Sequence, residues 1–332
     1  MRVLVTGAAG FIGAAVAQRL AERGDSVLGI DSLNDYYPVA LKQARLDRVQ
    51  AASSGRFRFH QVDFSDQHAL GEALATESFE RIVHLGAQPG VRYSLSNPHA
   101  YVQANVLGHL NILELARHRG IAHLVYASSS SVYGGNEQVP FAVGDDVDHP
   151  LSLYAATKRA DELMSETYAH LYRLPQTGLR FFTVYGPWGR PDMMIWLFTA
   201  KILAGEPIPV FNNGESLRDF TYIDDVVAGV IACLDKPPTD DGSLKPGGST
   251  KPHALYNLGN NRSEQLLEVI GVIEAACGRK AELVMLPPQP GDVDRTFADI
   301  APLAADTGFA PLTSIERGVP LFVEWYRAQY GR

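Results

Sequence analysis

Two residues that could share a proton stand one helical turn apart. In the segment YAATK, Tyr154 and Lys158 are four positions apart, which places both side chains on one face of a helix. A phenol with an ordinary pKa near 10 is a poor base at neutral pH, but a neighbouring ammonium favours the phenolate and lowers that pKa. The spacing therefore indicates Tyr154 as a candidate general base, with Lys158 as its partner.

A run of serines, Ser128–Ser131, lies upstream of this pair in the segment SSSSVYG. It follows a predicted strand, and open α/β sheets bind ligands at the carboxyl ends of their strands. A serine hydroxyl at this place could share a proton with a substrate oxygen and with the Tyr154 phenol. The alternative is a solvated turn without a chemical role.

The segment GAAGFIG, residues 7–13, follows the first predicted strand and opens the first predicted helix. Its spacing is G-x-x-G-x-x-G, and its glycines let the backbone approach a pyrophosphate at the positive end of the helix. Asp31 ends the next strand, where a carboxylate accepts bonds from a ribose and repels a 2′-phosphate, and no arginine follows it directly. This combination favours NAD over NADP; the alternative is an ordinary tight turn.

A fourth candidate, Asp63, ends the third predicted strand and could face the adenine amino group. A strand-end cap is an equally good interpretation of this residue.

Short apolar runs alternate with helical patterns and must position these groups. The spacing predicts strands at Arg2–Thr6, Ser26–Asp31, Arg56–Asp63, Arg81–Gly86, His123–Ser128 and Thr177–Thr183, with a helix over Gly10–Arg23. Strand–helix alternation, with strands that are apolar throughout, predicts an α/β fold with a doubly wound parallel sheet of the Rossmann type.

After about residue 185 prolines become frequent, and strand and helix patterns no longer alternate regularly. We expect residues 1–180 to form the dinucleotide-binding domain, with segments near 215–235 and 254–260 returning to it. Residues 181–332 mainly form a smaller mixed α/β lobe for the substrate. Residues 236–252 are rich in Pro, Gly and Ser, which predicts a flexible surface loop.

The composition excludes several classes of function. The charge of 29 − 37 = −8 over 332 residues offers no basic surface for nucleic acid. The two cysteines, Cys233 and Cys277, cannot form a disulfide framework, and no Cys/His cluster indicates a metal. No apolar run reaches the length of a membrane span or of a secretory signal, so we expect a cytoplasmic protein without a membrane partner.

Together GAAGFIG, Asp31, LGAQ (85–88), SSSSVYG and YAATK resemble the extended short-chain dehydrogenase/reductase superfamily over nearly the whole chain. Longer stretches at 84–108, 178–193 and 218–226 are similar to nucleotide-sugar 4-epimerases of the UDP-glucuronate branch. The resemblance implies NAD as the cofactor, a UDP-sugar as the substrate and a homodimer built on the helices near Ala104–Arg117 and Tyr154, which carry apolar residues such as Leu113 and Leu163. Packing of these helices against the sheet would fit the same periodicity.

The resemblance also implies roles for individual residues. For the NAD pyrophosphate, ribose and adenine they are Gly7, Gly10, Phe11, Ile12, Gly13, Asp31, Asn34, Asp63 and Phe64. Those lining the nicotinamide half are Gly86, Ala87, Gln88 and Asn105, and the further cofactor-binding residues are Leu85, Ser128, Tyr154, Lys158 and Tyr185. The catalytic residues are Tyr154, Lys158, Ser129 and Ser131, and the substrate-binding ones are Arg92, Ser129, Ser130, Ser131, Thr183, Arg190, Arg218 and Arg295.

One residue type is missing from the serine segment. Dehydratases and decarboxylases of the superfamily usually carry an acid there, whereas this chain has Ser130. The expected reaction is therefore 4-epimerisation of UDP-glucuronate and UDP-galacturonate through a transient 4-keto sugar. Three alternatives stay open: a UDP-glucose 4-epimerase, a UDP-glucuronate decarboxylase and a non-catalytic NAD-binding protein.

Overall fold

The computed structural model of the chain describes residues 1–288, 293 and 295–331. Its strands are β1 Arg2–Thr6, β2 Ser26–Asp31, β3 Phe57–Gln61, β4 Arg81–His84, β5 His123–Ser129, β6 Gln176–Phe181, β7 Thr183–Tyr185, β8 Ile208–Val210, β9 Leu217–Arg218, β10 Phe220–Tyr222, β11 His253–Leu258, β12 Glu264–Gln265 and β13 Leu283–Met285.

The α-helices are α1 Phe11–Arg23, α2 Val39–Ala52, α3 Gln67–Ala73, α4 Tyr93–Ser96, α5 Pro98–Tyr101, α6 Gly108–Arg119, α7 Leu153–Tyr172, α8 Met194–Ala204, α9 Ile223–Asp235, α10 Leu266–Cys277, α11 Ala301–Thr307 and α12 Ile315–Tyr330. A π-helix, η1 Val102–Leu107, and two 3₁₀ turns, η2 Ser130–Tyr133 and η3 Phe211–Gly214, complete the set.

Seven parallel strands form the central sheet in the order β11-β6-β5-β4-β1-β2-β3. The chain winds outward from β1 in one direction through β2 and β3, and then in the other through β4, β5 and β6. The predicted doubly wound parallel sheet is confirmed. Its winding reverses between β1 and β4, and the carboxyl ends of the strands beside such a point are the usual place of a ligand site.

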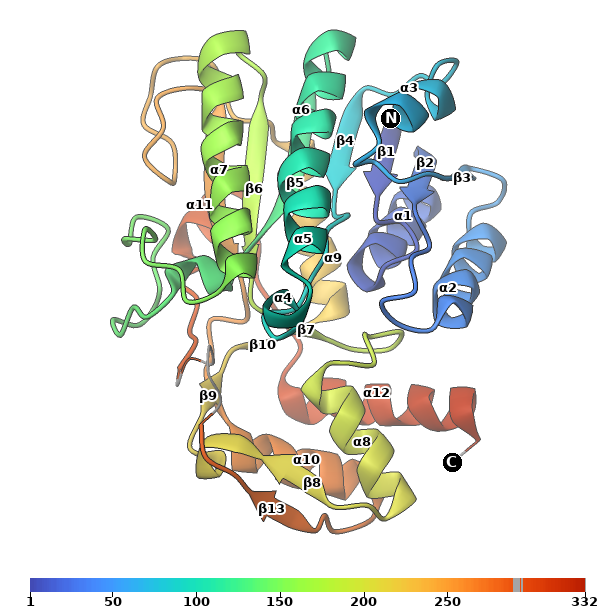
Figure 1. Cartoon of the computed structure of the whole chain (residues 1–332), viewed down its shortest axis with the longest axis vertical. Helices are drawn as coiled ribbons and strands as arrows, with labels where there is room; N and C mark the ends of the chain where they lie inside the picture. Colours follow the sequence, from blue (N-terminus) through green and yellow to red (C-terminus); the bar gives the residue numbers. More distant parts are fainter. Residues whose placement is uncertain (289–292, 294, 332) are drawn as a thin grey trace.

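Alternate residues of the central strands enter two different cores. In β1, Val3 and Val5 pack with α1, α2 and α9, whereas Leu4 packs with α3 and α6 on the opposite face. Figure 1 shows α6 and α7 in front of the sheet, with α1 and α9 behind it. Burial on both faces explains why these strands are apolar throughout.

Several predicted boundaries were wrong by one or two residues. Strand β3 stops at Gln61 and β4 stops at His84, because the chain beyond His84 turns so that the Gly86 amide donates to the Thr6 hydroxyl. The predicted strand Thr177–Thr183 is two strands: β6 ends at Phe181, and Thr183 opens β7, which pairs with β10 outside the main sheet. Gly10 caps α1 rather than starting it.

Segments of the chain after β7 form the lower region in Figure 1, which contains α8, α10, α12 and the strand pair β8–β13. Strand β11 returns to the main sheet and pairs with β6. Aromatic side chains of α12 contact the loop between β7 and α8: the ring centroids of Trp188 and Trp325 lie 5.3 Å apart. This packing fixes the loop that carries Arg190.

None of the helices in the described part of the chain combines the length and hydropathy that a membrane span requires.

Candidate active site

A cavity of about 420 Å³ opens at the carboxyl ends of the central strands. Its wall contains most of the residues singled out in the sequence: Gly7, Gly10, Phe11, Ile12, Gly13, Asp31, Asn34, Asp63, Phe64, Leu85, Gly86, Ala87, Gln88, Ser128, Ser129, Ser130, Ser131, Tyr154, Lys158, Thr183 and Arg190. These residues come from the ends of strands, from the loops after them and from helices α1 and α7, so the fold brings distant segments to one site.

The glycine loop has no room for side chains. A Cβ at Gly13 would lie 2.0 Å from the Gly7 carbonyl oxygen, and one at Gly7 would lie 2.7 Å from the Gly86 amide nitrogen. Gly7 also has a φ of 67°, in the region that glycine tolerates best. The start of α1, whose cap residue Gly10 supplies no side-chain bond, therefore presents its amide groups at the cavity wall. This cradle fits the pyrophosphate of a dinucleotide.

Asp31 lies at the end of β2, where backbone amides hold its carboxylate. Its oxygens accept hydrogen bonds from the amides of Leu33, at 2.9 Å, and Ala9, at 3.2 Å. Burial raises the pKa of Asp31, and these amides together with Lys42 oppose that rise. Lys42 also binds Asn34, at 2.6 Å to the carbonyl and 2.7 Å to the side-chain oxygen. The arrangement leaves a fixed carboxylate facing the cavity, which suits a ribose diol.

Helix α7 carries the Tyr–Lys pair into the cavity. Its first turn is capped by Ser152, whose hydroxyl oxygen accepts from the Ala155 amide at 3.1 Å. The Lys158 ammonium is buried and donates to the Ala127 carbonyl at 2.8 Å and to Asp161 at 2.9 Å. The Tyr154 ring is half-buried and packs edge-on against Tyr101, with 5.9 Å between centroids.

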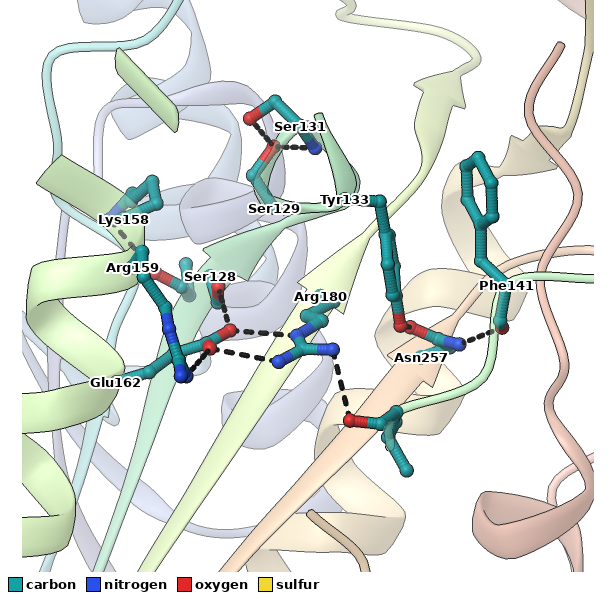
Figure 2. A network of polar contacts seen from close by, with 12 residues as sticks. Ser128, Ser129, Ser131, Tyr133, Phe141, Lys158, Arg159, Glu162, Arg180 and Asn257 are labelled. Atoms are coloured by element: carbon teal, nitrogen blue, oxygen red, sulfur yellow. Dashed lines mark hydrogen bonds and ion pairs between the residues drawn. The ribbon is translucent and has the colours of Figure 1, made fainter. Parts of the chain in front are cut away.

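The serines divide into two groups with different partners (Figure 2). The Ser131 hydroxyl donates to the Ser129 hydroxyl at 2.8 Å, and both residues line the cavity. The Ser128 hydroxyl points the other way and donates to Glu162 at 2.6 Å. Ser129 and Ser131 are therefore placed to act on a ligand, whereas the Ser128 side chain belongs to the support beneath them.

That support is a buried ion pair. The Arg180 guanidinium contacts both carboxylate oxygens of Glu162, at 2.8 and 2.9 Å, and Arg159 adds a bond at 3.1 Å (Figure 2). Burial opposes ionisation of Glu162, but Arg180 outweighs it and holds the pKa of Glu162 below its usual range. The pair ties α7 to β6 and so fixes the helix that carries Tyr154.

Arg190 reaches the cavity from the loop after β7 with its charge already partnered. Its guanidinium contacts Asp192 twice, at 3.0 and 2.7 Å. The Tyr36 hydroxyl donates to the same carboxylate at 3.1 Å. Burial, followed by the nearby Asp192 charge, raises the pKa of Tyr36 to about 12, which keeps it a donor.

Five predicted site residues lie outside this cavity wall. Asn105, in η1, is buried behind it, where its side-chain oxygen accepts a hydrogen bond from the Gln88 backbone N–H at 2.8 Å. Tyr185 donates to the Ser314 carbonyl at 3.2 Å. Arg92 stacks over Phe211, 5.3 Å from the ring centroid. Arg218 lies in β9, beside the bridge that joins Leu217 to Arg295.

Sequence reasoning missed several residues of the site. Tyr36, Tyr37, Lys42 and Met193 line the cavity, and Asp161 contacts Lys158. Arg45 lies under the glycine loop, where it donates to the Ala9 carbonyl at 3.1 Å and the Gly189 carbonyl at 2.7 Å. One signal was available: the helical spacing of Lys42, Arg45 and Val49 places two basic residues on a buried face.

The described part of the chain contains no group of three His, Cys, Asp or Glu residues that could hold a metal. A glycine-lined helix start, a ribose-side carboxylate and a buried Tyr–Lys pair on a doubly wound sheet instead define a dinucleotide-binding enzyme of the extended short-chain dehydrogenase/reductase class.

The chain belongs to the NAD dependent epimerase/dehydratase family, whose model matches residues 3–245. It is 46% identical over 338 residues to a Rhizobium meliloti protein named "Probable UDP-glucuronate 4-epimerase", covering 100% of this chain and 98% of that one. The UDP-glucuronic acid 4-epimerase of Bacillus cereus, solved with UDP-glucuronic acid and NAD, is 30% identical, with a TM-score of 0.86 and coverage of 99% and 100%. The UDP-glucose 4-epimerase of Thermotoga maritima, solved with UDP-glucose, is 29% identical, with a TM-score of 0.86 and coverage of 99% of each chain.

Proposed function

We propose that this protein is an NAD-dependent 4-epimerase that interconverts UDP-glucuronate and UDP-galacturonate through a transient 4-keto sugar. One observation carries the proposal: a single cavity brings the glycine cradle and Asp31 together with Tyr154, Lys158 and the hydroxyls of Ser129 and Ser131. The similarity to UDP-glucuronate 4-epimerases supports the choice of substrate.

The cofactor site is assigned to the same wall. Residues 7–13 would hold the pyrophosphate of NAD, Asp31 and Asn34 its adenosine ribose, and Asp63 and Phe64 the adenine. When bound, NAD would supply a reversible hydride acceptor for C4 of the sugar. Close packing at this wall requires a glycine at position 86, since a Cβ there would lie 2.5 Å from the Phe64 ring.

Tyr154 is the proposed base. Its phenolate takes the proton of the sugar 4-hydroxyl, holds it while C4 is a ketone, and returns it when C4 is reduced from the opposite face. Lys158 keeps positive charge behind the phenol, fixed by the Ala127 carbonyl at 2.8 Å. Ser129, paired with Ser131, offers a hydroxyl to the same sugar oxygen.

The sugar carboxylate would contact the hydroxyls of Ser129, Ser130, Ser131 and Thr183, and Arg190 lies in the same cavity wall. Among the described residues of the cavity wall, the carboxylates are Asp31 and Asp63, at the ends of other strands, and Glu162 beneath the serines is committed to Arg180. A wall without a free acid at this place favours retention of the carboxylate over decarboxylation. Arg218 and Arg295 are the proposed ligands of the UDP phosphates, and Arg92, like Arg190, is proposed to offer charge to the sugar carboxylate.

The direct test is to incubate the purified protein with NAD⁺ and UDP-glucuronate and to follow the anomeric proton of UDP-galacturonate by NMR. Formation of UDP-galacturonate without UDP-pentose is the expected result. If neither UDP-glucuronate nor UDP-glucose is inverted, the proposed function is wrong, and release of UDP-xylose or UDP-arabinose would assign a decarboxylase.

A second candidate is a 4-epimerase of neutral UDP-hexoses, which the similarity to the Thermotoga maritima enzyme favours. The hydroxyl-lined wall could hold a 6-hydroxymethyl group as well as a carboxylate. The ratio of kcat/KM for UDP-glucuronate and UDP-glucose decides between the two candidates.

The proposal includes a homodimer in the cytoplasm. Helices α7 and η1 pack together and expose apolar side chains, with Leu163 52% and Val102 47% exposed, whereas Leu113 is buried in the core. Two such faces could cover each other. Light scattering should give twice the chain mass, and Leu163→Glu should shift it toward the monomer. Both cysteines are free and buried, as suits a reducing compartment.

A further inference from the structure

A carboxylate stands directly behind the lysine of the Tyr–Lys pair. The Asp161 carboxylate lies 2.9 Å from the Lys158 ammonium, and the two side chains are only 1% and 3% exposed. Asp161 follows Lys158 on α7, one turn further from the cavity. The charge of the catalytic lysine is thus balanced inside the protein and not by solvent.

The position of Asp161 lies within a polar seam between two helical segments. Thr157 and Ser165, one turn before and after Asp161, bind the facing residues Asn105 and His109, at 3.0 and 2.9 Å. Between these contacts, one Asp161 carboxylate oxygen and the Nδ1 atom of His109 are both buried without a hydrogen-bond partner among the described residues. An unpaired buried carboxylate oxygen costs stability, so packing alone does not account for an acid here.

The other titratable groups around Asp161 do not replace it. Burial lowers the pKa of His84 to about 3 and moves that of His109 in the same direction, so both rings are neutral near pH 7. Burial keeps Tyr126, from β5, protonated by raising its pKa. Glu162 is bound by Arg180 from β6 and by Arg159. Asp161 is therefore the carboxylate that contacts Lys158 in the described part of the chain.

We propose that Asp161 is a positioning residue that sets the charge balance of the Tyr154–Lys158 pair and thereby the pH range of the reaction. The inference rests on the proposed function, in which Tyr154 must ionise while Lys158 stays charged. Burial raises the pKa of Asp161 to about 6, so near pH 7 its carboxylate is charged, stabilises the ammonium and opposes the phenolate. Removing that charge makes both groups release their protons more readily, so the active range moves to lower pH.

The test is the pH dependence of kcat/KM for Asp161→Asn, which keeps the shape of the side chain and an acceptor for Lys158. Both the acid and the alkaline limb should move down by about 1 pH unit relative to the unmodified protein. Glu166→Gln is the matched control, because Glu166 lies on the same helix but pairs with His253 and is 42% exposed. The acid and alkaline limbs of the Glu166→Gln profile should lie at the same pH as those of the unmodified protein.

A second measurement needs no substrate and so separates this inference from the proposed function. In the NAD-loaded protein, the ultraviolet absorbance of tyrosinate, corrected by that of Tyr154→Phe, gives the midpoint of Tyr154 ionisation. The midpoint should fall in Asp161→Asn even if UDP-glucuronate proves not to be the substrate. An unchanged midpoint, or unchanged limbs, would overturn the inference.

Folding of the variants is checked by circular dichroism, and Asp161→Ser provides a second variant that removes the charge with a smaller side chain. Whichever variant folds must show the downward shift. If both fail to fold, Asp161 serves stability alone and the inference is wrong.

Discussion

The hydroxyl of Tyr36 donates a 3.1 Å hydrogen bond to the carboxylate of Asp192, 156 positions further along the chain. This bond joins the loop after β2, on the ribose side of the cavity, to the loop that carries Arg190 on the substrate side. Because the same carboxylate binds the Arg190 guanidinium at 2.7 Å, one acid couples the two ends of the site.

Asp192→Asn should therefore change how a charged substrate is held. With its partner neutral, Arg190 becomes free to bind the sugar carboxylate, which should lower KM for UDP-glucuronate about tenfold and lower kcat, because a tightly held sugar turns over slowly. UDP-glucose, without a carboxylate, should show neither change. Steady-state kinetics with both sugars measures this, and Tyr36→Phe, which keeps the Arg190–Asp192 pair, should give a smaller effect. A higher KM for UDP-glucuronate would contradict the prediction.

Tyr154→Phe should keep the cofactor site and lose turnover. The phenyl ring preserves the packing against Tyr101, while the group that accepts the proton is gone, so kcat should fall roughly 10²- to 10⁴-fold. NAD binding, followed by fluorescence titration, should remain within a factor of about two, since the substitution removes one hydroxyl. A variant that retains full activity would exclude Tyr154 as the base.

Gly13→Ala should disrupt the glycine loop, because its Cβ would lie 2.0 Å from the Gly7 carbonyl oxygen. We expect NAD affinity to fall at least about a hundredfold, or the protein to lose several kcal/mol of stability, as for other overpacked sites. Gly271→Ala is the matched control. Gly271 lies inside α10 with open space around its Cβ position, so this change should raise stability by up to about 1 kcal/mol. Thermal unfolding and NAD titration compare the two variants.

Glu162→Gln should destabilise the protein by roughly 3–5 kcal/mol at neutral pH, because it leaves the buried Arg180 without its counter-charge. The pKa of Glu162 is lowered by folding, so its contribution is present above the ordinary value of 4.5 and is lost as the pH falls through the lower folded value. Urea unfolding should thus show that the free energy of unfolding differs between the unmodified protein and Glu162→Gln by an amount that becomes smaller below pH 4.5.

The control for this variant is Glu114→Gln, which alters a partly exposed pair with Arg117 and should cost less than about 1 kcal/mol. An equal loss of stability in both variants, or a difference that grows toward acid pH, would contradict the role given to the buried pair.

The features that could be predicted are those encoded over short distances. The glycine spacing, Asp31 at a strand end and the Tyr154–Lys158 turn each depend on a few consecutive residues, so the sequence pattern was sufficient to place them in one cavity. The doubly wound parallel sheet also followed from the regular alternation of strands and helices.

The residues that could not be predicted depend on contacts between distant segments. Nothing local marks Asp192 as a partner of Tyr36, or Glu162 as the ligand of Arg180. Asp161 looks like a solvent-facing acid until the packing of α7 against η1 and α6 shows that it is buried. Thr183 likewise leaves the main sheet for β7 because its amide donates to the carbonyl of Asp219, far along the chain.

Strand β11 has a consequence for biosynthesis. The family model ends at residue 245, yet the sheet is finished by residues 253–258, which pair with β6 along its whole length. While the nascent polypeptide is shorter than this, β6 presents an open row of amides and carbonyls that invites mispairing. Fragments truncated before His253 should therefore aggregate on expression, even though they retain the glycine loop of residues 7–13 and the Tyr154–Lys158 pair.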